Sequence, residues 1–169
     1  NKMQNKPQLI FIIAIISLLF SNCYSFRGTS IPQDISTFYV ENFTIESYDA
    51  PANLPIEMSE KLRNKIRSES RLKYTDTDPD IEFKGRISGY RVTPVAPQNN
   101  QLPSANRLEI TVSINYIDNK NNKNNWNNNF TFFKDFDNTT NFLDIRESLS
   151  NEIFDQIAED IFNRAFSNW

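Results

Sequence analysis

Apolar and polar side chains alternate along several segments of the chain, and this pattern predicts the strands of a sheet. The alternation is most regular over residues 107–117. One face carries Leu108, Ile110, Val112, Ile114 and Tyr116, and the other carries Arg107, Glu109, Thr111, Ser113 and Asn115. A period of two residues is typical of a strand that buries one of its faces. We therefore expect the apolar face of this strand to pack against the core.

A second long strand is predicted over residues 81–95. Its odd positions are Ile81, Phe83, Gly85, Ile87 and Gly89, and its even positions are Glu82, Lys84, Arg86, Ser88 and Tyr90. We expect the odd positions to face the core and the even positions, Tyr90 included, to face water. The two glycines would either make room for a closely packed helix or mark a bulge, and close approach of a ligand is the alternative.

Shorter strands are predicted where β-branched and aromatic residues gather. These segments are residues 35–45, the weaker segment 72–75 and residues 130–136. The Asn-rich segment 119–129 is interpreted as the connection of a hairpin. We therefore expect residues 130–136 to pair with the strand over residues 107–117.

Two helices are predicted from apolar residues that recur every three to four positions. The first begins near Pro55, which suits a first helical turn, and ends near Ser70. The second spans residues 143–166 and has a wide apolar face. A helix on a membrane surface is the alternative for the second, but its polar face carries Glu147, Glu152, Asp155, Glu159 and Asp160. Anionic lipids would repel that face, so packing against a sheet is favoured.

The order of these elements predicts an α+β fold. Two helices would pack on one face of an antiparallel sheet of four, possibly five, strands. The other face of the sheet would carry Lys84, Arg86, Arg107, Glu109 and Thr111. That face would be left for solvent or for a partner.

The first residues have the layout of a secretory signal. Lys2 and Lys6 precede the apolar run 9–20, and Cys23, the only cysteine, follows it. The run is too short to span a membrane, which takes about 20 apolar residues. We interpret Cys23 as the lipidated residue of a bacterial lipoprotein, and an ordinary signal peptide with an incidental cysteine is the alternative. This predicts a signal peptide over residues 1–22, a lipidated tether over 23–34 and a domain over 35–169.

Composition excludes several function classes. Removal of residues 1–22, which carry two lysines and no acid, changes the net charge from −3 to −5. An acidic domain is poorly suited to nucleic acid, which requires clustered Lys and Arg. The chain has no His, and a lipidated Cys23 leaves no free thiol, so we expect neither a metal site nor a cofactor. With three Gly, it has no Gly-rich phosphate loop.

Four segments together resemble a known family. They are CYSF at 23–26 running to Ile31-Pro32, GRISGYRVTPVAP at 85–97, NRLEITVSINY at 106–116 and IFNRAFSNW at 161–169. They resemble the Bacteroidetes branch of the LptE family, the lipopolysaccharide-assembly lipoproteins. The resemblance extends over essentially the whole chain after residue 22, and it implies two helices packed on a four-stranded sheet.

The resemblance also implies a function. Such proteins sit as plugs in the lumen of the LptD β-barrel of the outer membrane, help it fold, and assist insertion of lipopolysaccharide into the outer leaflet. Some members bind lipopolysaccharide directly. Residues 24–26 lack the acidic cluster that would resemble a surface-export signal, so we expect the periplasmic side of the outer membrane. The resemblance implies no enzyme activity.

Candidate contact residues follow from this expectation and from side-chain chemistry. Arginine and lysine donate charge-assisted hydrogen bonds to the phosphates of lipid A, and large aromatic residues anchor protein interfaces. The candidates for contact with lipopolysaccharide or the barrel are Lys84, Arg86, Arg91, Arg107, Trp126 and Trp169. Ordinary solvated sheet residues and core tryptophans are the alternatives. The loops 94–103 and 119–129 are further candidates for barrel contact.

Two other functions stay open at this point. A lipid-anchored binding or pilot protein of another envelope secretion machine would share the same signal. A small envelope hydrolase would need paired carboxylates, for which Asp76, Asp78 and Asp80 are the candidates. A solvated turn around Pro79 is the simpler interpretation of these three acids.

Overall fold

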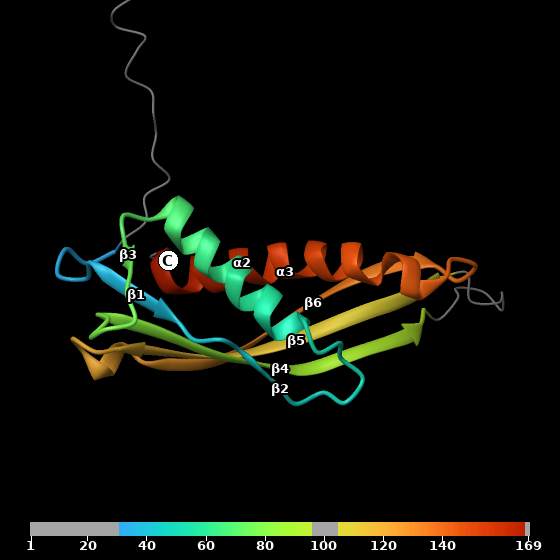
Figure 1. Ribbon diagram of the computed structural model, residues 1–169, viewed down its shortest axis with the longest axis horizontal. Helices are drawn as coiled ribbons and strands as arrows, with labels where there is room; N and C mark the ends of the chain where they lie inside the picture. Colours follow the sequence, from blue (N-terminus) through green and yellow to red (C-terminus); the bar gives the residue numbers. More distant parts are fainter. Residues whose placement is uncertain (1–30, 96–104, 168–169) are drawn as a thin grey trace, which may run out of the picture.

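The computed structural model describes residues 31–95 and 105–167 (Figure 1). Six strands and two α-helices make up this part of the chain. The strands are β1 (Thr37–Val40), β2 (Thr44–Ile45), β3 (Lys73–Tyr74), β4 (Ile81–Pro94), β5 (Ala105–Asp118) and β6 (Trp126–Asp137). The helices are α2 (Leu54–Glu69) and α3 (Phe142–Phe166), and a 3-10 turn, η2 (Asn122–Asn124), precedes β6. Cys23, Trp169 and the predicted boundary between residues 22 and 23 lie outside the described residues.

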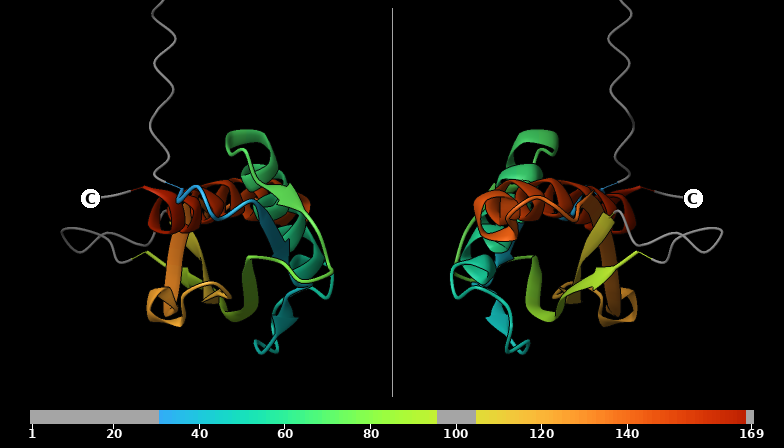
Figure 2. Two further views of the ribbon diagram at one scale, coloured as in Figure 1. Left: turned by 90° about the vertical axis from the view of Figure 1, so that its left-hand side faces the viewer. Right: turned by 90° about the vertical axis from the view of Figure 1, so that its right-hand side faces the viewer.

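The predicted α+β fold class is confirmed. End-on views show α2 and α3 together on one side of the sheet (Figure 2). The strands follow the order β3-β1-β4-β5-β6, and β2 also pairs with β4. The pairs β4–β5 and β5–β6 are antiparallel, whereas β1 runs parallel to β3 and to β4. The sheet is therefore mixed rather than purely antiparallel. The reason is that α2 returns the chain to the end of the sheet where β1 begins, so β3 runs in the same direction as β1.

The predicted strand over residues 35–45 is two strands. It is interrupted after Val40, and residues 41–43 belong to neither strand before β2 pairs with β4 at Thr44. The interruption places Phe43 over Gly85, where a Cβ atom would lie only 2.6 Å from the ring of Phe43. Gly85 therefore makes room for an aromatic ring rather than for a helix. The predicted connection over residues 119–129 is also shorter, since β6 already begins at Trp126.

Strand β4 contains an irregularity that reverses its predicted faces. The pairing with β5 shifts by one residue between Ile87 and Gly89. After the shift, Tyr90 pairs with Ile110 and is buried, while Gly89 pairs with Thr111. The prediction that Tyr90 faces water and Gly89 faces the core was wrong, because an extra residue in one strand exchanges the faces of every later position. The interpretation of Gly89 as a bulge residue agrees with this pairing.

The core lies between the sheet and the two helices. The predicted apolar faces of β5 and of α2 are buried, including Leu108, Ile110, Met58 and Leu62. The wide apolar face predicted for the second helix, α3, is buried along most of its length. This confirms that α3 packs on the sheet, and none of the helices among residues 31–95 and 105–167 is long and apolar enough to cross a membrane.

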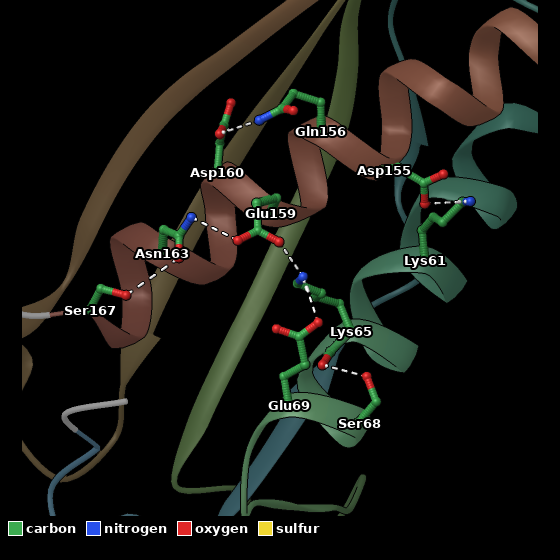
Figure 3. Close-up of polar contacts among 10 residues, drawn as sticks. All are labelled: Lys61, Lys65, Ser68, Glu69, Asp155, Gln156, Glu159, Asp160, Asn163 and Ser167. Carbon is green, nitrogen blue, oxygen red and sulfur yellow. Dashed lines mark hydrogen bonds and ion pairs between the residues drawn. The ribbon is translucent and has the colours of Figure 1, made fainter. Parts of the chain in front are cut away.

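Ion pairs join the two helices above the core (Figure 3). Lys61 of α2 pairs with Asp155 of α3 at 2.6 Å, and Lys65 pairs with Glu159 of α3 and with Glu69 of its own helix. Burial acts to lower the pKa of Lys65, but the hydrogen bonds and charges of Glu159 and Glu69 outweigh it and raise that pKa above its ordinary value. Two acids of the predicted acidic face of α3 therefore join the helices to each other.

The start of the domain is held at one end of the sheet. Arg71 donates a hydrogen bond to the carbonyl oxygen of Pro32 at 2.6 Å. Asp80 accepts hydrogen bonds from the backbone N–H groups of Ser36 and Thr37, at 2.7 and 3.0 Å. Because these contacts fix residues 31–37, they set the point from which the preceding chain leaves the domain. We call this end, which also contains the β5–β6 connection and the end of α3, the tether end (left in Figure 1).

Candidate partner-binding face

The side of the sheet opposite the helices is the candidate functional surface. It is formed by the side chains of β4, β5 and β6 that point away from α2 and α3, and we call it the open face. Strands β4 and β5 each have 14 residues, so the open face is about 45 Å long at roughly 3.3 Å per residue. The pattern of β5 predicted this face, and β6 adds its odd-numbered residues to it.

Hydroxyl and amide groups occupy the middle of the open face. The Ser113 hydroxyl donates to Asn129 Oδ1 at 2.6 Å and lies 3.0 Å from the Ser88 hydroxyl. Thr111 and Thr131, which are opposite each other in the sheet, are joined by a hydrogen bond of 2.8 Å. Such cross-strand pairs stabilise the sheet and leave further donors and acceptors exposed.

Ion pairs occupy the half of the open face that lies away from the tether end. Arg107 binds Asp135 with two hydrogen bonds of 2.6 and 2.9 Å, and its guanidinium lies 3.6 Å from the centroid of the Phe133 ring. The hydrogen bond to Asp135 raises the pKa of Arg107, and the same bond lowers the pKa of Asp135. Arg91 Nε donates to Glu109 Oε1 at 2.9 Å. Both pairs are partly exposed, and their main effect is to neutralise charge.

A polar hollow of about 270 Å³ lies where the chain leaves the sheet between β1 and β2. Lys84 and Arg86 line it together with Asn115 and Asn127. Lys84 lies 3.5 Å from Glu82, and Arg86 lies 3.0 Å from Glu46. The hollow therefore offers amide and cationic donors whose charges are already partly compensated.

The structure brings the four predicted cations onto one surface but gives each an acidic partner. Lys84, Arg86, Arg91 and Arg107 pair with Glu82, Glu46, Glu109 and Asp135. A phosphate group would have to displace or share these carboxylates. Contact between these cations and lipopolysaccharide stays a prediction. Strand periodicity placed Lys84, Arg86 and Arg107 on the open face, whereas Arg91 reaches it through the register shift after Ile87. The acidic partners depend on the pairing register and the path of the chain around β2, which single segments do not contain.

Trp126 lies on the helix side of the sheet and not on the open face. Its ring stacks on Tyr116 with centroids 5.2 Å apart, and the Arg164 guanidinium lies 4.9 Å from its centroid. A hollow of about 320 Å³ next to it is lined by residues of the tether end, including Ile31, Pro32 and Phe166. Trp126 therefore forms the margin of the core at the tether end, and its role in partner contact stays a prediction.

The three acids proposed for a hydrolase do not form a paired site. Asp80 is buried and accepts hydrogen bonds from Ser36, Thr37 and Lys120, whereas Asp76 and Asp78 are exposed on the turn before β4. The backbone hydrogen bond from Ser36 is the main reason that the pKa of Asp80 is well below its ordinary value. Within residues 31–95 and 105–167, there is also no group of three or more His, Cys, Asp or Glu that could hold a metal ion.

A comparison with protein families identifies the domain. The sequence profile of the LptE family, described as lipopolysaccharide-assembly, matches residues 35–165. The chain belongs to the LptE family. The match begins at the first buried residue of the described domain, Ile35, and ends one residue before the end of α3. The family is therefore confirmed, while its Bacteroidetes branch stays a prediction, and no curated protein sequence matches the chain.

Solved structures share the fold of this LptE family member at low sequence identity. A minor lipoprotein from Acinetobacter baumannii has 14% identity and a TM-score of 0.52, with 78% of this chain and 92% of that chain covered. The rare lipoprotein B from Shewanella oneidensis has 14% identity and a TM-score of 0.52, covering 74% and 91%. The hypothetical protein CT253 from Chlamydia trachomatis has 10% identity and a TM-score of 0.55, covering 79% and 99%. These likenesses establish the fold.

Proposed function

We propose that this LptE family member is an outer-membrane lipoprotein that plugs an LptD-like β-barrel, assists its assembly, and helps insert lipopolysaccharide into the outer leaflet. Lipidation at Cys23 would hold it on the periplasmic side, with the domain in the barrel lumen. The role would be non-enzymatic. The observation that carries the proposal is the family match over residues 35–165, a family described by lipopolysaccharide assembly.

The chemistry of the open face supports a place inside a barrel. The lumen of a large outer-membrane barrel is polar, so a plug needs a surface that forms hydrogen bonds rather than an apolar one. The open face offers serine, threonine and asparagine side chains in its middle and compensated ion pairs on either side. A nearly neutral polar surface can match hydrogen-bonding groups of a wall or of sugars without the cost of burying unpaired charge.

The two predicted contact loops lie at opposite ends of the domain. Residues 119–125 connect β5 to β6 at the tether end, whereas Val95 and Ala105 flank the other loop at the far end of the sheet. A partner that contacts both loops must therefore extend along the full length of β4 and β5. A barrel that surrounds the domain satisfies this requirement.

Affinity purification tests the proposed function, and crosslinking tests the open face. We expect the tagged protein, purified from gently solubilised membranes, to bring down a large β-barrel protein. A photo-crosslinking residue at Thr131 on the open face should form an adduct with that barrel. The comparison position is Ser68, an exposed residue on α2, which tests whether the barrel is also crosslinked from the helix side.

The purification and the crosslinking test different parts of the proposal. Recovery of the protein alone at native levels would contradict the function, whereas a barrel adduct from Ser68 but not from Thr131 would contradict only the choice of face. Depletion of the protein separates the alternative function. Loss of surface lipopolysaccharide supports our proposal, and loss of a different secreted product supports a pilot protein of another machine.

The lipid anchor gives a separate prediction. Replacing Cys23, the only cysteine, with alanine should abolish incorporation of labelled palmitate, because no other thiol can be acylated. The measurement is labelling in growing cells followed by immunoprecipitation, with Ser21→Ala as the control that should keep the label. Persistent labelling of the Cys23→Ala variant would show that Cys23 is not the acylated residue.

A further inference from the structure

Cations without acidic partners are unevenly distributed over the domain. The described residues contain fifteen Lys and Arg, because Lys2, Lys6 and Arg27 of the total of eighteen lie outside them. Nine of the fifteen have a carboxylate within ion-pair distance. The six for which the described part of the chain supplies no such partner are Arg67, Arg71, Lys73, Lys123, Arg146 and Arg164. All six are exposed.

Five of these six cations lie at the tether end, and we call them the tether-end cations. Arg71 donates to the carbonyl oxygen of Pro32, and Lys73 lies in β3, whose backbone pairs with β1 at Thr37. The Arg67 guanidinium lies 5.8 Å from the ring centroid of Tyr74, the residue that follows Lys73 in β3. On the other side, Arg164 lines the hollow that also contains Ile31, and Lys123 belongs to η2 in the β5–β6 connection. The cations therefore flank the segment from which the preceding chain leaves the domain.

Acids are fewer on this end of the domain. Asp34, Glu69, Asp76 and Asp78 are its exposed acids, and Glu69 is already paired with Lys65. The five tether-end cations therefore outnumber the three exposed acids that have no ion-pair partner among the described residues. Asp80 and Asp118 are buried there, and their oxygens accept hydrogen bonds from the protein's own backbone. The domain as a whole is acidic, with 21 acids among the residues that the structure describes. The tether end thus carries an excess of exposed cations without acidic partners on an otherwise acidic molecule.

The tether end is also the part of the domain that a lipid at Cys23 would bring nearest to a membrane. Seven residues lie between Cys23 and Ile31, so their Cα atoms are eight steps apart and can be separated by at most about 28 Å at full extension. A basic patch next to a lipid anchor is a common second signal for membrane attachment. Each Lys or Arg close to an anionic membrane surface contributes about five-fold in binding.

We propose that the tether end is a docking surface for the anionic phospholipid headgroups of the leaflet that holds the anchor. Arg67, Arg71 and Lys73 would bind on one side of the tether, and Lys123 and Arg164 on the other. With the tether end on the membrane, the long axis of the sheet points away from the membrane surface. The opposite end of the open face is then free to meet a partner. The proposal rests on the proposed lipid anchor for its orientation, but direct headgroup binding can be measured without the lipid.

Vesicle flotation tests the docking surface with the chain from residue 23 onward carrying Cys23→Ser, so that no acyl chain contributes. We expect this protein to float with vesicles of phosphatidylglycerol and phosphatidylethanolamine, and not with vesicles of phosphatidylcholine alone. The double variant Lys73→Glu/Lys123→Glu should bind at least about 25-fold more weakly, from about five-fold per cation. Both residues are exposed, so the fold should be retained, and this is checked by circular dichroism.

Arg146 provides the matched control, because it is exposed and lacks an acidic partner among the described residues but lies at the start of α3, away from the tether end. Arg146→Glu should leave vesicle binding unchanged. An equal loss in both variants would overturn the proposal, as would equal binding to neutral vesicles. Binding to lipopolysaccharide aggregates without binding to phospholipid vesicles would overturn it too. Failure of palmitate labelling at Cys23 would instead contradict the anchor.

Discussion

Replacing Phe83 with alanine is expected to lower the free energy of unfolding by about 3–5 kcal/mol, the usual cost of removing a large aromatic side chain from a core. Phe83 on β4 is fully buried, and its ring packs edge-on against Tyr116 and Phe166, with centroids 5.2 and 6.1 Å away. The substitution removes contacts to β5 and to α3 together. Urea denaturation followed by circular dichroism measures the effect.

Phe133→Ala is the matched control for this variant. Phe133 lies on the open face with 41% of its surface exposed, so the same substitution should cost about 1 kcal/mol or less. Similar losses for the two variants would contradict the assignment of the core to the helix side of the sheet. If Phe83→Ala does not fold, Phe83→Leu should fold with a smaller loss, because most of the apolar volume remains.

Replacing Asp80 with asparagine is expected to destabilise the domain by about 2–3 kcal/mol, since hydrogen bonds to a charged acceptor are stronger than neutral ones. The carboxylate accepts bonds from the backbone of Ser36 and Thr37 and from the Ser36 hydroxyl, and it lies 3.0 Å from Lys120 Nζ. Asparagine keeps the shape but loses the charge and one acceptor oxygen. Asp78→Asn is the control, because Asp78 is exposed with a φ of 46°, a conformation that asparagine tolerates.

Asp80 also predicts a pH dependence. Its pKa in the folded domain is lowered from the ordinary value of 3.8, chiefly by the hydrogen bond from the backbone of Ser36. A carboxyl with a lowered pKa contributes its full stability above the unfolded pKa, and that contribution is lost as the pH falls below about 4. The difference in stability between the natural protein and Asp80→Asn should therefore shrink on acidification. A difference that stays constant from pH 6 to strongly acidic solution would contradict this account.

The largest difference between the sequence-based prediction and the structure concerns the partners of the cations on the open face. Strand periodicity correctly placed Lys84, Arg86 and Arg107 on the face away from the helices. It could not show that Glu46 and Asp135 lie beside Arg86 and Arg107, because Glu46 follows β2 and Asp135 lies in β6. For the same reason, the sequence did not predict that cations without acidic partners gather at the tether end. Lys73, Lys123 and Arg164 are distant in the sequence and share no pattern.

The sequence by itself determined the elements whose signal is local. The span of α2, the wide apolar face of α3 and the buried face of β5 follow from repeats of 3.6 and two residues, which require no knowledge of neighbouring elements. The tertiary structure decided what depends on neighbours. An extra residue near Ser88 turns Tyr90 into the core, β1 lies parallel to β4, and a gap after Val40 puts Phe43 over Gly85. Strand direction, register and charge compensation arise from contacts between distant segments, so no single segment carries them.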